Sequence, residues 1–217
     1  MKEKTLLKML AICLFLSFSL CPALDLDESL HRACEIGDTI RMKEILKKGA
    51  NVNTKNKQGQ TPLWYAASSG SKSAVLILLK KGAKVNARNY NDRTALMQAC
   101  WYGHKDIVKL IIEKGADVNA KGKFNDTALM KAVRKGHKEI AALLIENGAD
   151  INAKTDWGRT ALLFAIFNGD KDMVILLIKK GANVNIKTKK GRTPLNWAMV
   201  NRYKEIIEIL KNAGAKE

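Results

Sequence analysis

The chain repeats one stretch, Arg93–Asn119, which reads RTALMQACWYGHKDIVKLIIEKGADVN, with a period of 33 residues. Four of its positions keep one residue type from copy to copy. The series are Thr61, Thr94, Thr127, Thr160 and Thr193; Leu30, Leu63, Leu96, Leu129, Leu162 and Leu195; Gly49, Gly82, Gly115, Gly148, Gly181 and Gly214; and Asn53, Asn86, Asn119, Asn152 and Asn185. A fixed period of about 20 to 50 residues is typical of small supersecondary units stacked on one another. The sequence therefore predicts a solenoid.

Each copy is predicted to hold two helices and a connection. Thr followed by Pro or Ala and then Leu favours a helix start, because the Thr oxygen can accept from free N–H groups and Pro suits the first helical position. The first helix of the quoted copy is expected over residues 95–102, ending at Gly103. Apolar residues at helical spacing between Ile107 and Ile112 predict a second helix that ends at Gly115. A polar, glycine-bearing connection follows it.

These features resemble the ankyrin repeat. The resemblance lies in the period, in Thr-Pro-Leu at 61–63 and 193–195, and in Gly-Ala-(Asp/Asn)-Val-Asn near the end of most copies. It covers about residues 26–216 and implies an all-α solenoid of stacked helix pairs with β-turn fingers. Since no linker-like run interrupts the repeats, we expect one repeat domain over 24–217. Its units are expected at about 26–58, 59–91, 92–124, 125–157, 158–190 and 191–217.

The first and last copies depart from the pattern. The first copy has Arg41 where the third has Ile107, and Glu44 where the third has Leu110. The last copy has Arg202 where the others place a glycine at the end of the first helix. End repeats of a stack need a polar outer face, so both departures are interpreted as solubility caps.

The first 23 residues differ in kind from the repeats. Three lysines lead into a short apolar run, Met9–Leu20, and Cys21-Pro22-Ala23 follows it. This is the pattern of a secretory signal, and the run is shorter than the roughly 20 residues that a transmembrane helix needs. We expect a signal peptide over 1–23, cleaved after Ala23, and an exported protein, periplasmic or extracellular. An uncleaved N-terminal membrane anchor is the main alternative.

The chain is strongly basic. Three lysines and one glutamate would leave with the signal, so the +17 formal charge of the whole chain would become +15. Part of this charge has a structural explanation, because many lysines precede the repeating glycine at a helix end, where cations are favourable. The rest could attract an acidic protein, an anionic lipid surface or a nucleic acid.

Two cysteines would remain after cleavage, Cys34 and Cys100, at the same position of the first and third copies. Packed helices stand about 8 to 10 Å apart, which separates the two by roughly 20 Å, whereas a disulfide needs Cα atoms within about 7 Å. We therefore expect no disulfide between them and treat both thiols as small buried hydrophobic groups.

The sequence shows no catalytic constellation. His104 and His137 occupy equivalent positions after glycine, and structural use is the interpretation that we favour over a ligand pair. No cysteine or second carboxylate is spaced to complete a metal site, and the glycine of a phosphate loop is absent. We expect no enzyme activity, no metal and no cofactor.

The informative residues are those that the repeat leaves free. In ankyrin-like proteins the finger tips and the two positions before the first glycine line the concave face. Aromatic and basic residues, the types enriched in binding hot spots, occupy these positions here. The candidate partner-binding residues are Tyr90, Arg93, Trp101, Tyr102, Phe124, Arg134, Lys135, Trp157, Arg159 and Phe167. Alternatively, some aromatics pack half-buried against the next finger, Phe124 and Trp157 above all.

Three functions were weighed. The first is an exported, non-enzymatic and monomeric scaffold that binds a protein with an acidic surface through its concave face, with aromatics as anchors and Arg93, Arg134, Lys135 and Arg159 for steering. The second is a basic peripheral module on anionic lipid or another polyanion, which a salt titration would separate from the first. An enzyme is the third, and nucleic acid is not an expected partner.

Overall fold

The structure is a computed structural model that describes residues 26–216, so the predicted signal over 1–23 lies outside the described residues. The described chain divides between Lys84 and Val85 into two compact units, and each is treated by itself. The single repeat domain over 24–217 stays a prediction. Within residues 26–216, no helix is both long enough and apolar enough to span a membrane.

The first unit contains two helix pairs. Residues 26–36 are helical, and α2 (Thr39–Lys47), α3 (Pro62–Ser69) and α4 (Lys72–Lys80) follow. A side-chain oxygen caps each of the second helices, since Asp38 accepts from the Arg41 N–H and Ser71 from the Ala74 N–H. Met42 and Ile45 face the core of this unit, while Arg41 and Glu44 are exposed. The polar outer face predicted for the first copy is therefore confirmed.

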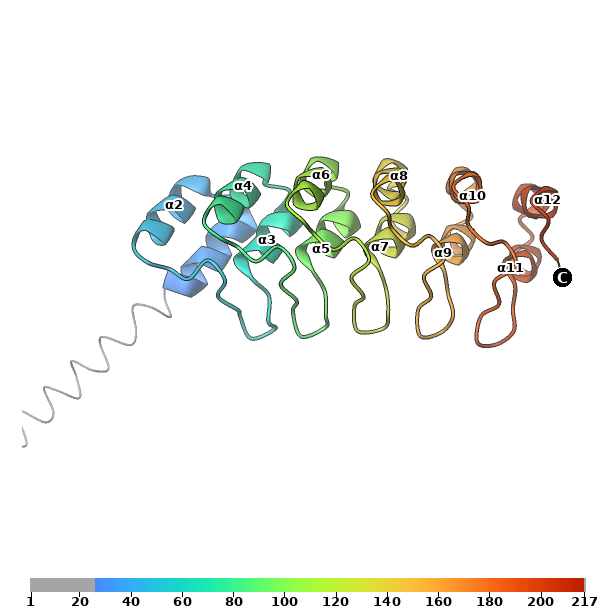
Figure 1. Ribbon diagram of the computed structural model, residues 1–217, viewed down its shortest axis with the longest axis horizontal. Helices are drawn as coiled ribbons and strands as arrows, with labels where there is room; N and C mark the ends of the chain where they lie inside the picture. The colour runs from blue at the N-terminus through green and yellow to red at the C-terminus, as the bar shows by residue number, and fades with distance from the viewer. Residues whose placement is uncertain (1–25, 217) are drawn as a thin grey trace, which may run out of the picture. The chain divides into compact units, whose positions relative to one another are not determined.

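The second unit contains four helix pairs in two layers. The first helix of each pair, here called the inner helix, contacts the next inner helix, and the second, or outer, helices form the other layer (Figure 1). The inner helices are α5 (Ala95–Tyr102), α7 (Ala128–Arg134), α9 (Ala161–Phe167) and α11 (Pro194–Val200). The outer helices are α6 (Lys105–Glu113), α8 (Lys138–Glu146), α10 (Lys171–Lys179) and α12 (Lys204–Asn212).

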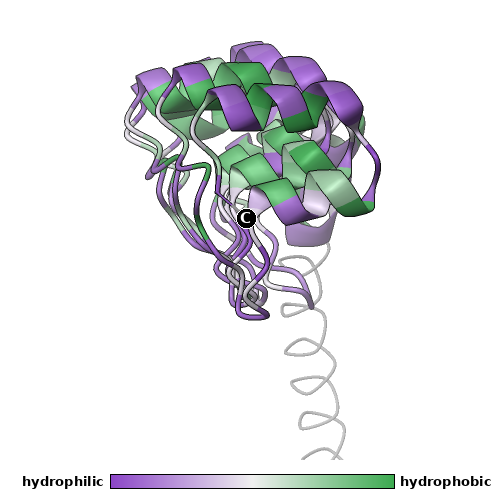
Figure 2. Ribbon diagram, turned by 90° about the vertical axis from the view of Figure 1, so that its right-hand side faces the viewer, coloured by the Kyte–Doolittle hydropathy of each residue, from purple (hydrophilic) through white to green (hydrophobic). Residues whose placement is uncertain are grey.

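Four long turns, here called fingers, complete the second unit. They span residues 85–93, 118–126, 151–159 and 184–192, and each leads into an inner helix. The fingers extend beyond the helix layers on one side, and they are mostly hydrophilic (Figure 2). The described residues contain helices and turns but no strand, which confirms the predicted all-α class.

The repeated threonine begins each inner helix, as predicted. The side chains of Thr94 and Thr127 accept from the N–H three residues on, and Thr193 and Asn196 form a reciprocal capping box. Thr160 is the exception. Its backbone is extended like the others, but its side chain makes no cap bond and its buried hydroxyl oxygen has no partner within the described residues. The cap predicted from the series is therefore wrong at this one helix.

The left-handed turn that ends the inner helices is also repeated. Gly103 ends α5 with φ +81°, as predicted. In the last copy Arg202 occupies the same left-handed region with φ +59°, although it has a side chain. A non-glycine residue there costs roughly 1 to 2 kcal/mol. The local geometry of the repeat is thus kept without the glycine.

The core alternates between the two helix layers. The repeated leucines of the inner helices are at most 1% exposed, and Ile107, Ile140 and Ile206 of the outer helices are buried as well. Cys34 and Cys100 are free and fully buried, each within its own unit. Burial raises the pKa of the Cys34 thiol to about 12 and raises the pKa of Cys100 too. Both thiols behave as buried hydrophobic groups, as predicted.

The repeated asparagine joins one copy to the next. The side chain of Asn119 donates to the Gly148 carbonyl at 2.9 Å and accepts from the Asp150 N–H at 2.8 Å. Asn86 makes the same two bonds one copy earlier, to Gly115 and Asp117. Since a buried or half-buried carbonyl without a partner costs free energy, the series of Asn and Gly residues is explained by this shared bonding.

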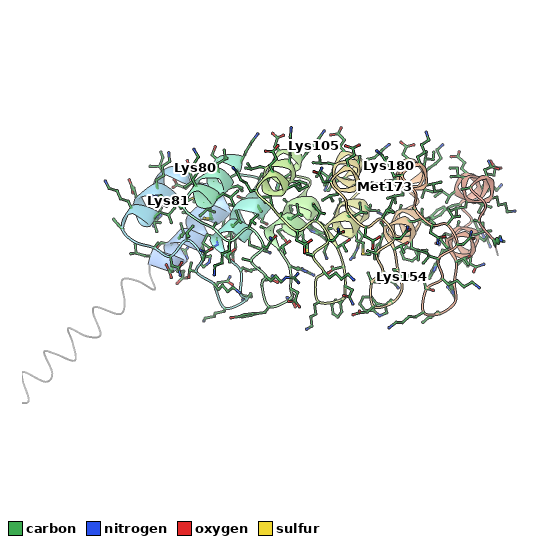
Figure 3. The ribbon with its side chains drawn as sticks, viewed as in Figure 1. Lys80, Lys81, Lys105, Lys154, Met173 and Lys180 are labelled. Carbon is green, nitrogen blue, oxygen red and sulfur yellow. The ribbon has the colours of Figure 1, made fainter. Side chains whose placement is uncertain are left out.

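Exposed ion pairs run along the outer helices. Lys105 pairs with Glu139 at 2.7 Å, Lys138 with Asp172 at 2.8 Å and Lys171 with Glu205 at 2.6 Å. Lys180 and Glu146 form a further pair at 3.1 Å, and Figure 3 places Lys105 and Lys180 on this layer. Exposed pairs contribute about 0 to 1 kcal/mol each. Part of the basic charge therefore serves contacts between neighbouring copies.

Candidate partner-binding face

The inner helices of the second unit present three of their residues away from the leucine core. In α5 these are Gln98, Trp101 and Tyr102, with Gln98 buried, Trp101 half-buried and Tyr102 50% exposed. The residue 33 positions on from Trp101 is Arg134, and the next is Phe167. The repeat therefore places unlike side chains at one position of adjacent helices, and their contacts decide what this face can bind.

Trp101 is surrounded by three cations from α7 and the turn after it. The distance from its ring centroid is 4.3 Å to Lys135 Nζ, 5.6 Å to Lys131 Nζ and 5.6 Å to Arg134 Cζ. A cation within about 6 Å of an aromatic ring is attracted by the negative face of the ring. The predicted residues Trp101, Arg134 and Lys135 are thus brought together by the fold.

Lys131 is a buried cation, 5% exposed, and it is ion-paired with Asp126, the last residue of its finger. Burial lowers the pKa of the Lys131 ammonium, and the positive charges of Arg93 and Arg134 lower it further. The Asp126 carboxylate opposes this effect. Arg93 is exposed and acts on this group through its charge, which places it in the same electrostatic neighbourhood as Lys131.

A second set of rings and cations continues from α7 to α11. The guanidinium of Arg134 lies 5.2 Å from the Phe164 centroid, and that of Arg159 lies 5.4 Å from Phe167. Phe167 contacts Phe164 at 6.1 Å. Each guanidinium therefore rests on a ring that belongs to its own chain, as the ammonium groups around Trp101 do.

The same pattern ends at α11. Trp197 meets Phe167 edge-on, with centroids 4.7 Å apart, and the Arg192 guanidinium lies 4.8 Å from the Trp197 ring. We call the whole set the cation–aromatic row. Its members are Trp101, Lys131, Arg134, Lys135, Arg159, Phe164, Phe167, Arg192 and Trp197.

The end of α5 that carries Trp101 is held by the next copy. The Nε2–H of His137 donates to the Trp101 carbonyl oxygen at 3.3 Å. Gly103 makes room for this imidazole, since a Cβ on Gly103 would come within 2.6 Å of His137 Cε1. His137 therefore has a structural use, as predicted, and it supports the position of Trp101.

The remaining predicted aromatics lie apart from the row. Tyr102 stacks on His104 with centroids 6.2 Å apart, and Tyr90 is 69% exposed at the tip of its finger. Phe124 and Trp157 contact each other across adjacent finger tips at 5.2 Å. They are nevertheless 46% and 51% exposed, so packing against the next finger covers only part of each ring. The predicted residues therefore fall in two regions.

Four members of the row were not among the predicted residues, namely Lys131, Phe164, Arg192 and Trp197. Lys131, Phe164 and Trp197 precede positions 134, 167 and 200 by three residues, and residues three apart share a helix face. Arg192 stands in register with Arg159. The signal was thus present in the spacing, but burial made it hard to separate these residues from the core.

The described residues contain no group of three or more His, Cys, Asp or Glu side chains that could hold a metal ion. A cavity of about 510 Å³ lies where the turns after α5 and α7 meet the start of α8, and Gly103, His137 and Glu139 are among the residues that line it. A further cavity of about 530 Å³ lies in the first unit beside His31 and Tyr65. The row, in contrast, is an open surface of paired rings and cations.

Comparison with known proteins identifies the repeat. A family model described as "Ankyrin repeats (3 copies)" matches residues 30–122, 91–155 and 129–217. A segment of 49 residues, 23% of this chain, is 41% identical to the ADP-ribosylation factor GTPase-activating protein AGD4 of Arabidopsis thaliana. The match spans only 6% of that relative, so it indicates a shared repeat and no shared activity. Because the family model covers nearly all of residues 30–217, the chain belongs to the ankyrin-repeat family.

Proposed function

We propose that this chain is an exported, non-enzymatic scaffold that binds an acidic segment of a protein partner along the cation–aromatic row. Ankyrin repeats imply a protein-interaction scaffold. The observation that carries the finer proposal is the position of Arg134, whose guanidinium lies 5.6 Å from Trp101 and 5.2 Å from Phe164. A cation held in this way points its charge at the face where a partner would lie.

The rings act as supports for the cations in this proposal. Arg134, Lys135 and Arg159 are exposed, so their N–H groups remain accessible to a carboxylate. A guanidinium that stacks on a ring is already oriented, and it loses less conformational freedom when it pairs. Charge-assisted hydrogen bonds to carboxylates are among the strongest that proteins form. The partner segment is therefore expected to carry several Asp or Glu residues.

The role of Trp101 differs from that of an apolar anchor. Lys131, Arg134 and Lys135 gather round its ring, so less of the ring is open to a partner's hydrophobic side chain. We infer that Trp101 contributes by holding these cations in place. The basic charge of the chain would add long-range attraction and raise the association rate, and this attraction would weaken with salt.

The test uses the full chain and a fluorescent polyglutamate peptide, with polyglutamine as the uncharged probe, and measures fluorescence anisotropy. Arg134→Gln with Lys135→Gln should weaken polyglutamate binding about tenfold or more, since a hydrogen bond to a charged group contributes about 1.5 to 3 kcal/mol. Lys109→Gln with Lys114→Gln, on α6 and in the turn after it, removes the same charge from exposed positions and should change binding less than twofold.

Two outcomes would contradict the proposal. Equal losses in both double variants would mean that only net charge matters, and no loss in either would place the site elsewhere. Trp101→Leu separates the two roles of the ring, because leucine keeps an apolar group but cannot hold a cation. Affinity near that of the parent chain for Trp101→Leu would contradict the supporting role while leaving the face itself in place.

Partner capture provides an independent measurement. The double variant Trp101→Ala with Tyr102→Ala should lose the proteins that the full chain retains from its own cell envelope, as quantified by mass spectrometry. Export is tested on the same material, because a mass that lacks residues 1–23 would show cleavage after Ala23. Retention of the same proteins by the double variant would argue against this face.

A further inference from the structure

The finger tips of the second unit are joined into one continuous edge. The Lys123 N–H donates to the Asn91 carbonyl at 3.0 Å, and the Asp156 N–H donates to the Phe124 carbonyl at 3.1 Å. The Lys189 N–H continues the series to the Trp157 carbonyl at 3.2 Å. These bonds fix each tip against the next, and the fingers extend beyond the inner helices (Figure 1). The edge is therefore an ordered, protruding surface.

Aromatic rings stand open along this edge. Tyr90 is 69% exposed, Phe124 46% and Trp157 51%, and Phe124 and Trp157 lie side by side with centroids 5.2 Å apart. Lys123 Nζ is 6.0 Å from the Phe124 centroid, at the outer limit of a cation–ring contact. Large exposed apolar groups that adjoin one another on a soluble protein usually mark an interaction site.

The fingers that carry these rings are strongly basic. Their basic residues are Arg88, Arg93, Lys121, Lys123, Lys154, Arg159, Lys187, Lys189, Lys190 and Arg192, and their acidic residues are Asp92, Asp126 and Asp156. Two of these acids are occupied within the fold, since Asp126 pairs with Lys131 and Asp156 accepts from the Asn125 side chain. The excess of positive charge on this edge is therefore larger than the sequence count alone suggests.

One basic series is regular and exposed. Lys121, Lys154 and Lys187 follow one another at intervals of 33 residues, at the same position of adjacent fingers, and all three are exposed. Figure 3 shows Lys154 on its finger, on the side of the molecule away from the outer helices. Since neighbouring repeats stack about 8 to 10 Å apart, the series places a positive charge at each step along the edge.

We propose that this edge, here called the finger rim, binds an anionic lipid surface. The rim consists of Tyr90, Lys121, Lys123, Phe124, Lys154, Trp157, Lys187, Lys189 and Lys190. Tryptophan and tyrosine side chains favour the headgroup level of a bilayer, because one part of each is apolar and another is polar. The lysines would pair with lipid phosphates, since an anionic leaflet attracts basic residues that come close to it.

A lipid surface fits the rim better than a peptide does. The rings of the rim are open and project outward, whereas a peptide that is bound by charge would be better served by the cations held over rings in the row. A bilayer needs no pocket, and a protruding edge can meet it along its whole length. The inference goes beyond the proposed protein binding, which concerns the row, so either can fail without the other.

The test reads the depth of one tryptophan in a bilayer. The full chain is mixed with phosphatidylcholine vesicles whose acyl chains carry bromine, with or without phosphatidylglycerol, and tryptophan emission is recorded. Bromine quenches only rings that enter the bilayer. Anionic vesicles should quench the parent chain, and Trp157→Phe should remove most of that quenching. Trp101→Phe, in the row, is the matched control and should leave the quenching in place.

Charge variants sharpen the result. Each lysine near an anionic surface contributes roughly fivefold to binding. Lys121→Gln with Lys154→Gln and Lys187→Gln should therefore raise the lipid concentration for half-maximal quenching at least tenfold. Lys109→Gln with Lys114→Gln and Lys179→Gln, from the outer layer, remove the same charge at exposed positions and should shift it less than threefold.

The opposite results would overturn the proposal. Absence of quenching that depends on Trp157, or equal quenching by vesicles without phosphatidylglycerol, would show that the rim does not read anionic lipid. Equal shifts in the two triple variants would reduce the effect to net charge. Loss of polyglutamate binding in the rim variant, without Trp157-dependent quenching, would assign the rim to an acidic protein instead. Circular dichroism of every variant verifies that the fold is intact.

Discussion

The cation–aromatic row and the finger rim contain the same residue types but differ in what lies over the rings. In the row, Lys135 is 4.3 Å from the Trp101 centroid and Arg192 is 4.8 Å from Trp197. In the rim, Trp157 contacts only another ring, Phe124, among the described ring contacts and is half exposed. Composition therefore does not decide the chemistry of a surface here. The neighbours that each repeat supplies decide whether a ring supports a cation or stays open.

The largest expected effect comes from Gly103→Ala, which should disturb the row and spare the rim. Its φ of +81° is unfavourable for alanine, and the added Cβ would lie 2.6 Å from the His137 ring that holds Trp101. We expect the free energy of unfolding to fall by about 2 to 4 kcal/mol in urea denaturation.

The matched control is Gly148→Ala, which has a similar φ of +84° but meets nothing within 4 Å. It should lose only the backbone contribution of roughly 1 to 2 kcal/mol. Equal losses in the two variants would show that the contact with His137 contributes nothing to the row.

The next effect tests the buried ion pair at the junction of finger and row. Asp126→Asn removes the carboxylate that pairs with buried Lys131, and leaving a buried charge unpaired costs about 3 kcal/mol. Lys131→Met should cost less, because methionine fills similar space without a charge. Chemical denaturation of both variants checks the order, and a larger loss in Lys131→Met would contradict it.

The pH dependence of stability follows from the same lysine. Because the pKa of Lys131 is lower in the folded state than its ordinary value of 10.5, the unfolded chain binds this proton more tightly. Stability from this group therefore rises as pH rises through the folded pKa towards 10.5, and it falls at lower pH. Lys131→Met should lack this rise, whereas Asp126→Asn should enlarge it, because the carboxylate that supports the charge is gone. Denaturation curves across the alkaline range provide the measurement.

The smallest effect concerns the link between Arg159 of the row and α9. Thr160→Val should change the free energy of unfolding by only a few tenths of a kcal/mol, since the Thr160 hydroxyl caps nothing and its oxygen is buried without a partner. Thr127→Val should cost about 1 kcal/mol, because its side chain accepts from the Met130 N–H. Similar losses at the two positions would mean that Thr160 does cap its helix.

The fold was largely predictable because each repeated residue has one local role. Thr94 caps a helix, Gly103 turns left-handed, and Asn119 bonds to the next copy, and each role follows from backbone chemistry that short range fixes. Thr160 shows the limit of this reasoning. Its sequence context matches that of Thr127, so nothing in the series distinguishes the helix without a cap.

The candidate site was predictable in part. The positions that the repeat leaves free identified Trp101, Arg134 and Phe167, and the fold brings these residues onto adjacent helices. Lys131 and Phe164 were missed, because a buried position three residues earlier is indistinguishable from core by pattern alone. The role of Trp101 also escaped prediction, since the cations beside its ring come from the next repeat.

The sequence by itself determined the repeat, the helix pairs, the all-α class and the residues that are free to vary. Its period and its Thr, Gly and Asn series are local signals, and local hydrogen bonding is enough to specify them. The tertiary structure alone decided that Arg134 lies between Trp101 and Phe164 while Trp157 stays open beside Phe124. The physical reason is that these contacts join residues about one repeat apart, and their distances are set by how neighbouring copies stack.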